Sequence, residues 1–151
     1  TKAALYYHFA GKSDVLNAIF TGYLDEIAEV VEASADHGSG EQRLRWLVQH
    51  LFALPAGRRA IMRLAMHDVG QLEPEQRASF GTAYIDRFIG PLQQIVADGV
   101  ASGEFVAKDP SLVVWILLGM LYPFFAPRGG PGVDADSIDD LLDVFFGGLS
   151  A

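Results

Sequence analysis

Acid–base or metal chemistry in this chain of 151 residues would have to come from four histidines and nineteen carboxylates, because the chain has no cysteine. His8, His37, His50 and His67 are never spaced so that two share one helical face with a carboxylate base, the usual pattern of a helical zinc site. The lack of cysteine also excludes disulfides and thiolate nucleophiles. The sequence therefore predicts no catalytic residue, no metal site and no cofactor.

Two groups of residues with carboxylates could suggest a calcium site or an acid–base pair. The aspartates between Asp134 and Asp143 lack the glycine and the final glutamate of a calcium-binding loop, and acids are favoured at the positive end of a helix. His67 and Asp68 are neighbours, but neighbours on a helix point in different directions and do not form a dyad. An all-helical enzyme with one of these two as a buried acid or base is kept as an alternative.

Aromatic, methionine and histidine side chains recur at helical spacing through the chain. Phe80, Tyr84 and Phe88 are four apart, while Trp115 and Tyr122 share a face of an apolar segment. Such stripes form either plain core or the wall of a largely apolar ligand cavity. The predicted cavity wall consists of Trp46, His50, Met62, Met66, His67, Tyr84, Phe88, Trp115 and Tyr122. For its two histidines, a hydrogen-bonded place in the core is the alternative.

Helices must position these side chains, because apolar residues follow spacings of three and four and no convincing strand alternation occurs. Glycine and proline mark the breaks, and Pro91 should kink the helix that contains it. The fold class predicted is all-α, with six helices after a short first one, over residues 12–35, 44–52, 61–69, 74–103, 112–125 and 138–149.

Charge is distributed unevenly along a chain whose net charge is −8. The first twelve residues contain Lys2, His8 and Lys12 but no acid, so a small basic segment precedes an acidic body. The longest apolar run, Leu112 to Ala126, has fifteen residues, whereas a membrane span needs about 20. We therefore expect a buried helix there, no membrane partner and, because no signal peptide is recognisable, a cytoplasmic protein.

The basic segment carries a family resemblance. Residues 1–9, read as TKAALYYHF, together with Lys12 and the pair Val15-Leu16, resemble the recognition helix and the next helix start of the tetracycline-repressor (TetR) family. The resemblance implies that Lys2 and Lys12 neutralise phosphates. The residues it assigns to DNA are Thr1, Lys2, Ala3, Ala4, Tyr6, Tyr7, His8 and Lys12. The alternatives to these DNA contacts are that the lysines are simply solvated and that one of the tyrosines lies in the core. The sequence departs from the family pattern at Gly11, which replaces a common capping side chain.

The resemblance also implies a domain order. Residues 1–11 would end a helix-turn-helix, residues 12–35 would form a connecting helix, and residues 36–151 would bind ligand and dimerise. A recognition helix needs a supporting helix and turn ahead of it, so we expect about 45 further residues to precede Thr1 in the natural protein. Only that longer protein is expected to bind operator DNA.

Family members pair through their last two helices, which implies a homodimer with its two recognition helices about 34 Å apart. The implied interface consists of Leu117, Leu118, Leu121, Leu141, Leu142, Phe145 and Leu149. The expected function is a repressor that binds operator DNA as a dimer and is released by a small, largely apolar effector. A helical dimerisation module, with a coincidental match at its N-terminus, is the remaining alternative.

Overall fold

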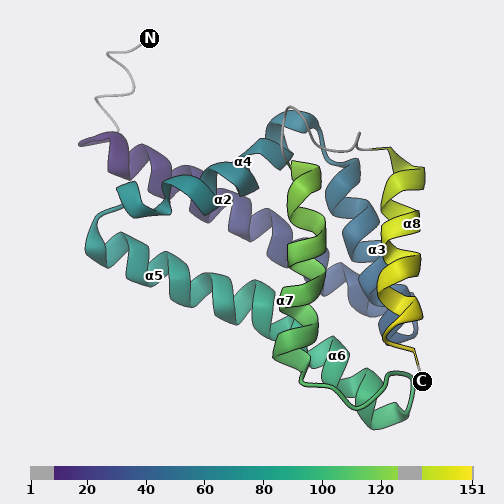
Figure 1. The fold of residues 1–151 in the computed structure, drawn as a ribbon. Helices are drawn as coiled ribbons and strands as arrows, with labels where there is room; N and C mark the ends of the chain where they lie inside the picture. The colour runs from purple at the N-terminus through teal and green to yellow at the C-terminus, as the bar shows by residue number, and fades with distance from the viewer. Residues whose placement is uncertain (1–8, 126–133, 151) are drawn as a thin grey trace.

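The computed structural model describes residues 9–125 and 134–150, and over these ranges the chain forms six helical rods (Figure 1). The all-α prediction is confirmed. The elements are α2 (Lys12–Ala33), η1 (Ser34–His37), α3 (Gly40–Ala53), α4 (Ala56–Asp68), η2 (Val69–Gln71), α5 (Pro74–Tyr84), η3 (Ile85–Ile89), α6 (Gly90–Ser102), α7 (Pro110–Leu121), η4 (Tyr122–Phe125) and α8 (Ala135–Gly147). One rod comprises α5, η3 and α6.

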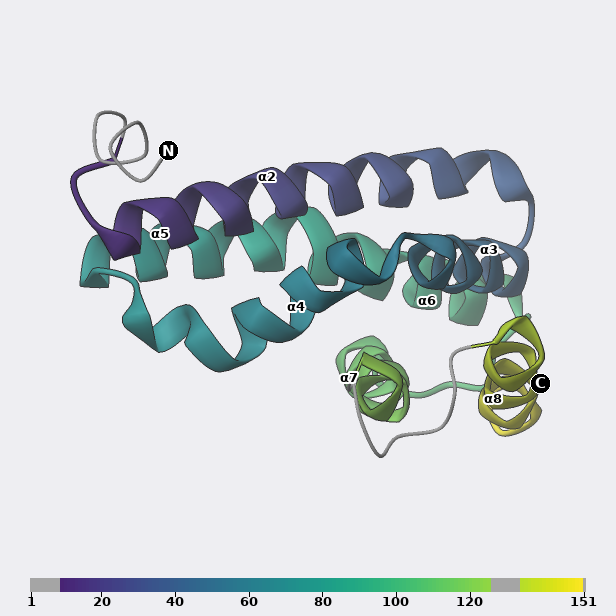
Figure 2. The same cartoon turned by 90° about the horizontal axis from the view of Figure 1, so that it is seen from above.

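The helix α2 runs along the length of the molecule, with α4 and α5 packed against it (Figure 2). In the same view α7 and α8 are seen end-on, so they run across α2 rather than along it. The helix α7 packs on α6, and α8 packs on α3. As a result, α2 contacts α4 and α5 along its length, and its first residue directly follows the N-terminal segment of the chain.

Most helix boundaries follow local chemistry that is visible in the sequence. The Ser39 hydroxyl accepts from the backbone N–H of Gln42, and the Asp109 and Asp134 carboxylates cap α7 and α8 in the same way. Gly103 ends α6 with φ of 79°, a left-handed conformation that favours glycine. Gly11 precedes α2 without a side-chain cap, as the sequence indicates.

The sequence predicts a kink at Pro91, and the structure has a π-helical turn just ahead of this residue. Residues Ile85–Ile89 form a π-helical turn, in which the N–H of Gly90 donates to the carbonyl of Ile85 five residues back. A Cβ atom at position 90 would lie 3.2 Å from that oxygen, so glycine suits this position. Because Pro91 has no N–H and its ring would crowd the carbonyl of Arg87 in a regular α-helix, the wider turn relieves both problems.

The apolar faces of α7 and α8 form part of the chain's own core. Six of the seven leucine and phenylalanine residues expected at a dimer interface are buried within the single chain, and Leu118 is partly buried. They point toward α6 and α3, so they retain little surface to bury against a second copy. The large apolar side chains that these helices leave exposed are Leu112, Trp115, Ile116 and Val144. None of the helices described is long and apolar enough to cross a membrane.

A carboxylate from a distant connection caps α3. One oxygen of Glu104 accepts from the N–H of Gly40 at 2.9 Å, and the other accepts from the N–H of Glu41 at 2.8 Å. Burial raises the pKa of Glu104, but hydrogen bonds from the Glu41 N–H, the Ser39 hydroxyl and the Gly40 N–H outweigh burial and hold the pKa below its usual value. The ionised carboxylate therefore fastens the loop after α6 to the start of α3.

Glu104→Gln should lower the free energy of unfolding by about 1 kcal/mol at neutral pH, because the amide offers a single acceptor oxygen and no charge. The folded-state pKa is lowered, so this contribution is complete above the unfolded pKa of about 4.3 and disappears as the pH falls through the folded value. Urea unfolding at several pH values measures the difference, with the exposed residue Glu75→Gln as control. A difference that stays constant down to acid pH contradicts the assignment.

Candidate binding cavity

A cavity of about 330 Å³ lies between α2, α4, α5 and α7. Apolar and aromatic side chains make up most of its wall, and its volume is at the small end of the range for ligand pockets. The helix α2 contributes four residues, and the opposite wall comes from α4 and α5, which pack against α2 on its inner side (Figure 2). The wall consists of Phe20, Tyr23, Leu24, Ile27, Met62, Ala65, Met66, Val69, Phe80, Gly81, Tyr84 and Trp115.

Four of the nine residues predicted for a ligand cavity lie in this wall: Met62, Met66, Tyr84 and Trp115. Met66 and Trp115 are half exposed, at 54% and 50%, and Gly81 is also exposed, so this part of the wall reaches the surface. Met62 is buried. In the structure, α4, α5 and α7 contribute these four residues to the wall of one cavity.

The other five predicted residues lie outside the wall for identifiable reasons. Phe88 lies within the π-helical turn and is 1% exposed in the core, with its ring 5.4 Å from that of Tyr84. The Tyr122 hydroxyl and His67 Nε2 form a hydrogen bond of 3.0 Å that joins η4 to the end of α4. Both members of that pair are exposed.

Trp46 and His50 form part of a separate aromatic stack. The ring of Trp46 lies 4.2 Å from that of His37 and 4.8 Å from that of His50, both in stacked geometry. The stack joins η1 to α3, and the cavity wall described above contains no residue of α3. Trp46 and His50 share the helical spacing of the cavity residues, but their helix does not contribute to the wall.

The contribution of α2 was missing from the predicted wall. Phe20, Tyr23, Leu24 and Ile27 belong to the apolar stripe of this helix, which the sequence assigns only to a connecting role. Phe80, one turn before Tyr84, also belongs to the wall. The signal for α2 is its aromatic pair Phe20 and Tyr23, because a buried tyrosine presents a polar atom that needs a partner.

Tyr23 and Tyr84 supply the polar atoms of interest in an otherwise apolar wall. Burial raises the pKa of Tyr23 to about 12, with smaller contributions from Glu26 and Tyr84, and burial likewise raises the pKa of Tyr84 to about 12. Both phenols therefore remain protonated donors at neutral pH. Within residues 9–125 and 134–150, neither hydroxyl forms a hydrogen bond with the protein, and neither oxygen is completely shielded from solvent, so both are accessible from the cavity.

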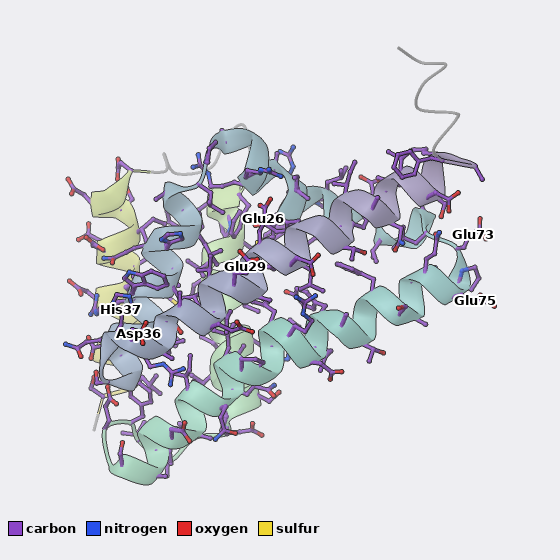
Figure 3. The ribbon with its side chains drawn as sticks, turned by 180° about the vertical axis from the view of Figure 1, so that it is seen from behind. Glu26, Glu29, Asp36, His37, Glu73 and Glu75 are labelled. Carbon is purple, nitrogen blue, oxygen red and sulfur yellow. The ribbon has the colours of Figure 1, made fainter. Side chains whose placement is uncertain are left out.

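Charged side chains surround the cavity without lining it. On α2, Glu26 pairs with Arg58 at 3.1 Å and Asp25 pairs with Arg87 at 2.6 Å. Figure 3 shows Glu26 and Glu29 along α2 on the side of the molecule away from the viewer of Figure 1. The two arginines that contact α2 are thus already paired with carboxylates.

Catalytic and metal chemistry finds little support in the described residues. His67 bonds to Tyr122, whereas Asp68 accepts from Gln71, so the two neighbours face different partners. In the part of the chain that the structure describes, no three histidine or acidic side chains come together as metal ligands.

A family model for the tetracyclin repressor-like C-terminal domain matches residues 37–126, which is more than half of the chain. This chain belongs to the tetracycline-repressor family. Its relatives in that family are transcription regulators. No curated protein sequence matches the chain.

Solved TetR-family structures share the fold over almost the whole chain. A TetR/AcrR regulator from Thermobifida fusca is 28% identical, with a TM-score of 0.72 over 98% of this chain and 80% of that one. PfmR from Thermus thermophilus is 24% identical, with a TM-score of 0.81 over 100% and 84%. AibR, in complex with isovaleryl coenzyme A and operator DNA, is 24% identical, with a TM-score of 0.79 over 97% and 80%.

In this TetR-family chain, the first turn of α2 is bound to the start of α5. The hydroxyl of Ser13 donates to the side chain of Gln76, and the amide of Gln76 donates to the Asp14 carboxylate at 2.8 Å. The N–H of Glu73 donates to the Ser13 hydroxyl at 3.0 Å. Any displacement of α5 relative to α2 must therefore act on the beginning of α2.

Of the residues predicted to contact DNA, only Lys12 is among the described residues. It is exposed at the start of α2 and donates to the side chain of Gln71 in η2. Thr1, Lys2, Ala3, Ala4, Tyr6, Tyr7 and His8 lie outside the described residues.

Proposed function

We propose that this chain is the ligand-sensing part of a TetR-family repressor that binds operator DNA as a dimer and leaves it when a small, largely apolar effector occupies the cavity. The observation that carries the proposal is the cavity itself, because α2 forms one of its walls and leads back to the segment that resembles a recognition helix. The complex of AibR with an acyl thioester and operator DNA supports this combination of ligands on the same fold. A repressor of this kind acts in the cytoplasm.

The mechanism requires that the effector prefer one position of α2. An effector that binds better to the state with poorly spaced recognition helices lowers the DNA affinity by that preference, typically by about 1 to 3 kcal/mol of coupling, or roughly 5- to 150-fold. The contacts of Ser13 and Asp14 with Gln76 supply the physical link, since they tie α2 to α5, the opposite wall.

Dimerisation is part of the proposal and uses the exposed face of α7 and α8. Leu112, Trp115, Ile116 and Val144 are between 48% and 72% exposed, and α7 is apolar on all sides. A helix of that kind is normally covered on most of its surface. The buried leucines beneath these residues then support the interface from within rather than form it.

The test uses the protein made from the natural gene. Selection from a pool of random DNA duplexes should enrich a near-palindromic site, because a two-fold dimer reads two half-sites. Binding should weaken steeply with salt, as expected when lysines displace counterions from phosphates. Enrichment of no sequence over the input pool would overturn the repressor assignment.

Gln76→Ala tests the link between cavity and DNA. We expect ligand binding to the cavity and operator binding without ligand to change little, while ligand-induced release falls by about fivefold or more. The reason is that the variant removes both side-chain contacts of Gln76 with the first turn of α2 and leaves only the bond from the Glu73 N–H to Ser13 among those described above. Operator titrations with and without a neutral, largely apolar ketone, benzylacetone, measure the release. The choice of this compound follows from the chemistry of the cavity wall described in the next subsection. Gln94→Ala is the control, because Gln94 lies on α6 and, among the residues that the structure describes, its side chain bonds to Asp98 of the same helix. Unchanged release in Gln76→Ala contradicts this route.

A further inference from the structure

We propose that the cavity selects an uncharged, largely apolar ligand with one hydrogen-bond acceptor, such as a ketone, ester or lactone oxygen, and that the hydroxyls of Tyr23 and Tyr84 hold this oxygen. The inference rests on the proposed function, of which it specifies the effector class. This effector class differs from the ligand of AibR, which carries coenzyme A.

The hydroxyls of Tyr23 and Tyr84 are available to a ligand. Tyr23 is 5% exposed and Tyr84 is partly buried, both line the cavity, and in the described part of the chain neither hydroxyl is hydrogen-bonded. Neither oxygen is a fully buried atom without a partner, so both remain accessible from the cavity, and a ligand acceptor would exchange a contact with water for one ordinary hydrogen bond. Both side chains therefore present a polar atom to the same cavity.

The two donors come from different helices. Tyr23 belongs to α2 and Tyr84 to the last turn of α5, so an oxygen that accepts from both joins the two helices across the cavity. A ligand that merely fills apolar space lacks this bridge. The acceptor therefore adds both affinity and a defined spacing between α2 and α5.

The composition of the cavity wall disfavours charged ligands. No residue of the wall is charged, and a carboxylate or phosphate that loses its hydration without a cation pays a large penalty. Arg58 and Arg87, the arginines beside α2, are paired with Glu26 and Asp25. A cation would gain from the aromatic wall, but the nearby carboxylates are engaged by those arginines and the two hydroxyls present donors.

Three compounds with one phenethyl skeleton test the selectivity: benzylacetone is neutral, hydrocinnamate is anionic and phenethyltrimethylammonium is cationic. Affinities are measured by tryptophan fluorescence, since Trp115 lies in the wall, and by the shift in melting temperature. We expect benzylacetone to bind about tenfold or more tightly than either charged compound. Tighter binding of hydrocinnamate or phenethyltrimethylammonium overturns the inference, and so does the absence of saturable binding by all three.

Tyr23→Phe and Tyr84→Phe test the two donors with little change of shape. Each should weaken benzylacetone binding by about fivefold, the equivalent of one ordinary hydrogen bond, and leave the weak binding of hydrocinnamate unchanged. Tyr122→Phe is the matched control, because that hydroxyl bonds to His67 outside the wall. Equal affinities in all three variants overturn the role of the hydroxyls.

A negative result in these ligand-binding tests is distinguishable from a failure of the proposed repressor function. A cavity that prefers hydrocinnamate or the ammonium compound still senses a ligand, and the repressor assignment stands. The DNA selection experiment judges that assignment separately, since it requires no ligand at all.

Discussion

Phe88→Ala should lower the free energy of unfolding by about 3 to 5 kcal/mol, which is a large part of the stability of a domain this size. The Phe88 side chain is 1% exposed and packs in the main core beside Tyr84, where the shortened side chain leaves a cavity that the surrounding helices cannot fill. Guanidinium unfolding followed by circular dichroism measures the loss.

Trp115→Ala is the informative comparison for Phe88→Ala. Trp115 is 50% exposed and lines the cavity, so we expect a smaller stability loss and a clear loss of benzylacetone affinity. The sequence groups these two aromatics in one ligand site. If Phe88→Ala kept its stability and lost only ligand binding, the core position of Phe88 would be contradicted.

Gly81→Leu should abolish saturable binding of benzylacetone while leaving the fold intact. Gly81 lies in the cavity wall, and a Cβ atom there meets nothing within 4 Å, so the new side chain can occupy space that the ligand needs. The glycine is inside α5, where leucine is the better helix former by about 0.5 to 1 kcal/mol. Melting temperature and fluorescence titration together separate the two effects.

Gly22→Leu is a matched control for this experiment. Gly22 is also inside a helix and is exposed, and a Cβ atom added there would likewise meet nothing within 4 Å, but this glycine lies outside the cavity wall. The same gain in helix propensity is expected, with ligand affinity preserved. Loss of binding in both variants would mean that glycine flexibility, rather than occupied space, governs the cavity.

Much of the fold could be predicted because local signals and packing agree. Apolar spacing locates all six rods, and Ser39, Asp109, Asp134 and Gly103 mark boundaries by capping or by left-handed geometry. The π-helical turn could not be predicted, since Pro91 indicates only that a regular helix is unfavourable. Which of several irregular turns relieves it depends on how α5 and α6 pack.

The candidate cavity was predicted less completely, because periodicity identifies the apolar face of a helix but not its neighbour. Met66 and Trp115 meet around one space, whereas Trp46 stacks with two histidines elsewhere. Long-range packing makes that choice. It also explains why Leu142, 0% exposed, is core in the single chain although its type and spacing equally suit an interface between chains.

The π-helical turn at Ile85–Ile89 also lets this part of the cavity wall tolerate a change in chain length. The wide turn holds one residue more than a regular α-helical turn, and the bond from the Gly90 N–H to the Ile85 carbonyl keeps the flanking helices aligned. Deleting one residue there would make the turn regular and leave Phe80, Gly81 and Tyr84 in the wall they share with α2, whereas a deletion in a regular turn of α6 would rotate them by about 100° relative to the end of that helix. An alignment gap at the π-helical turn in a relative is therefore compatible with the same effector pocket.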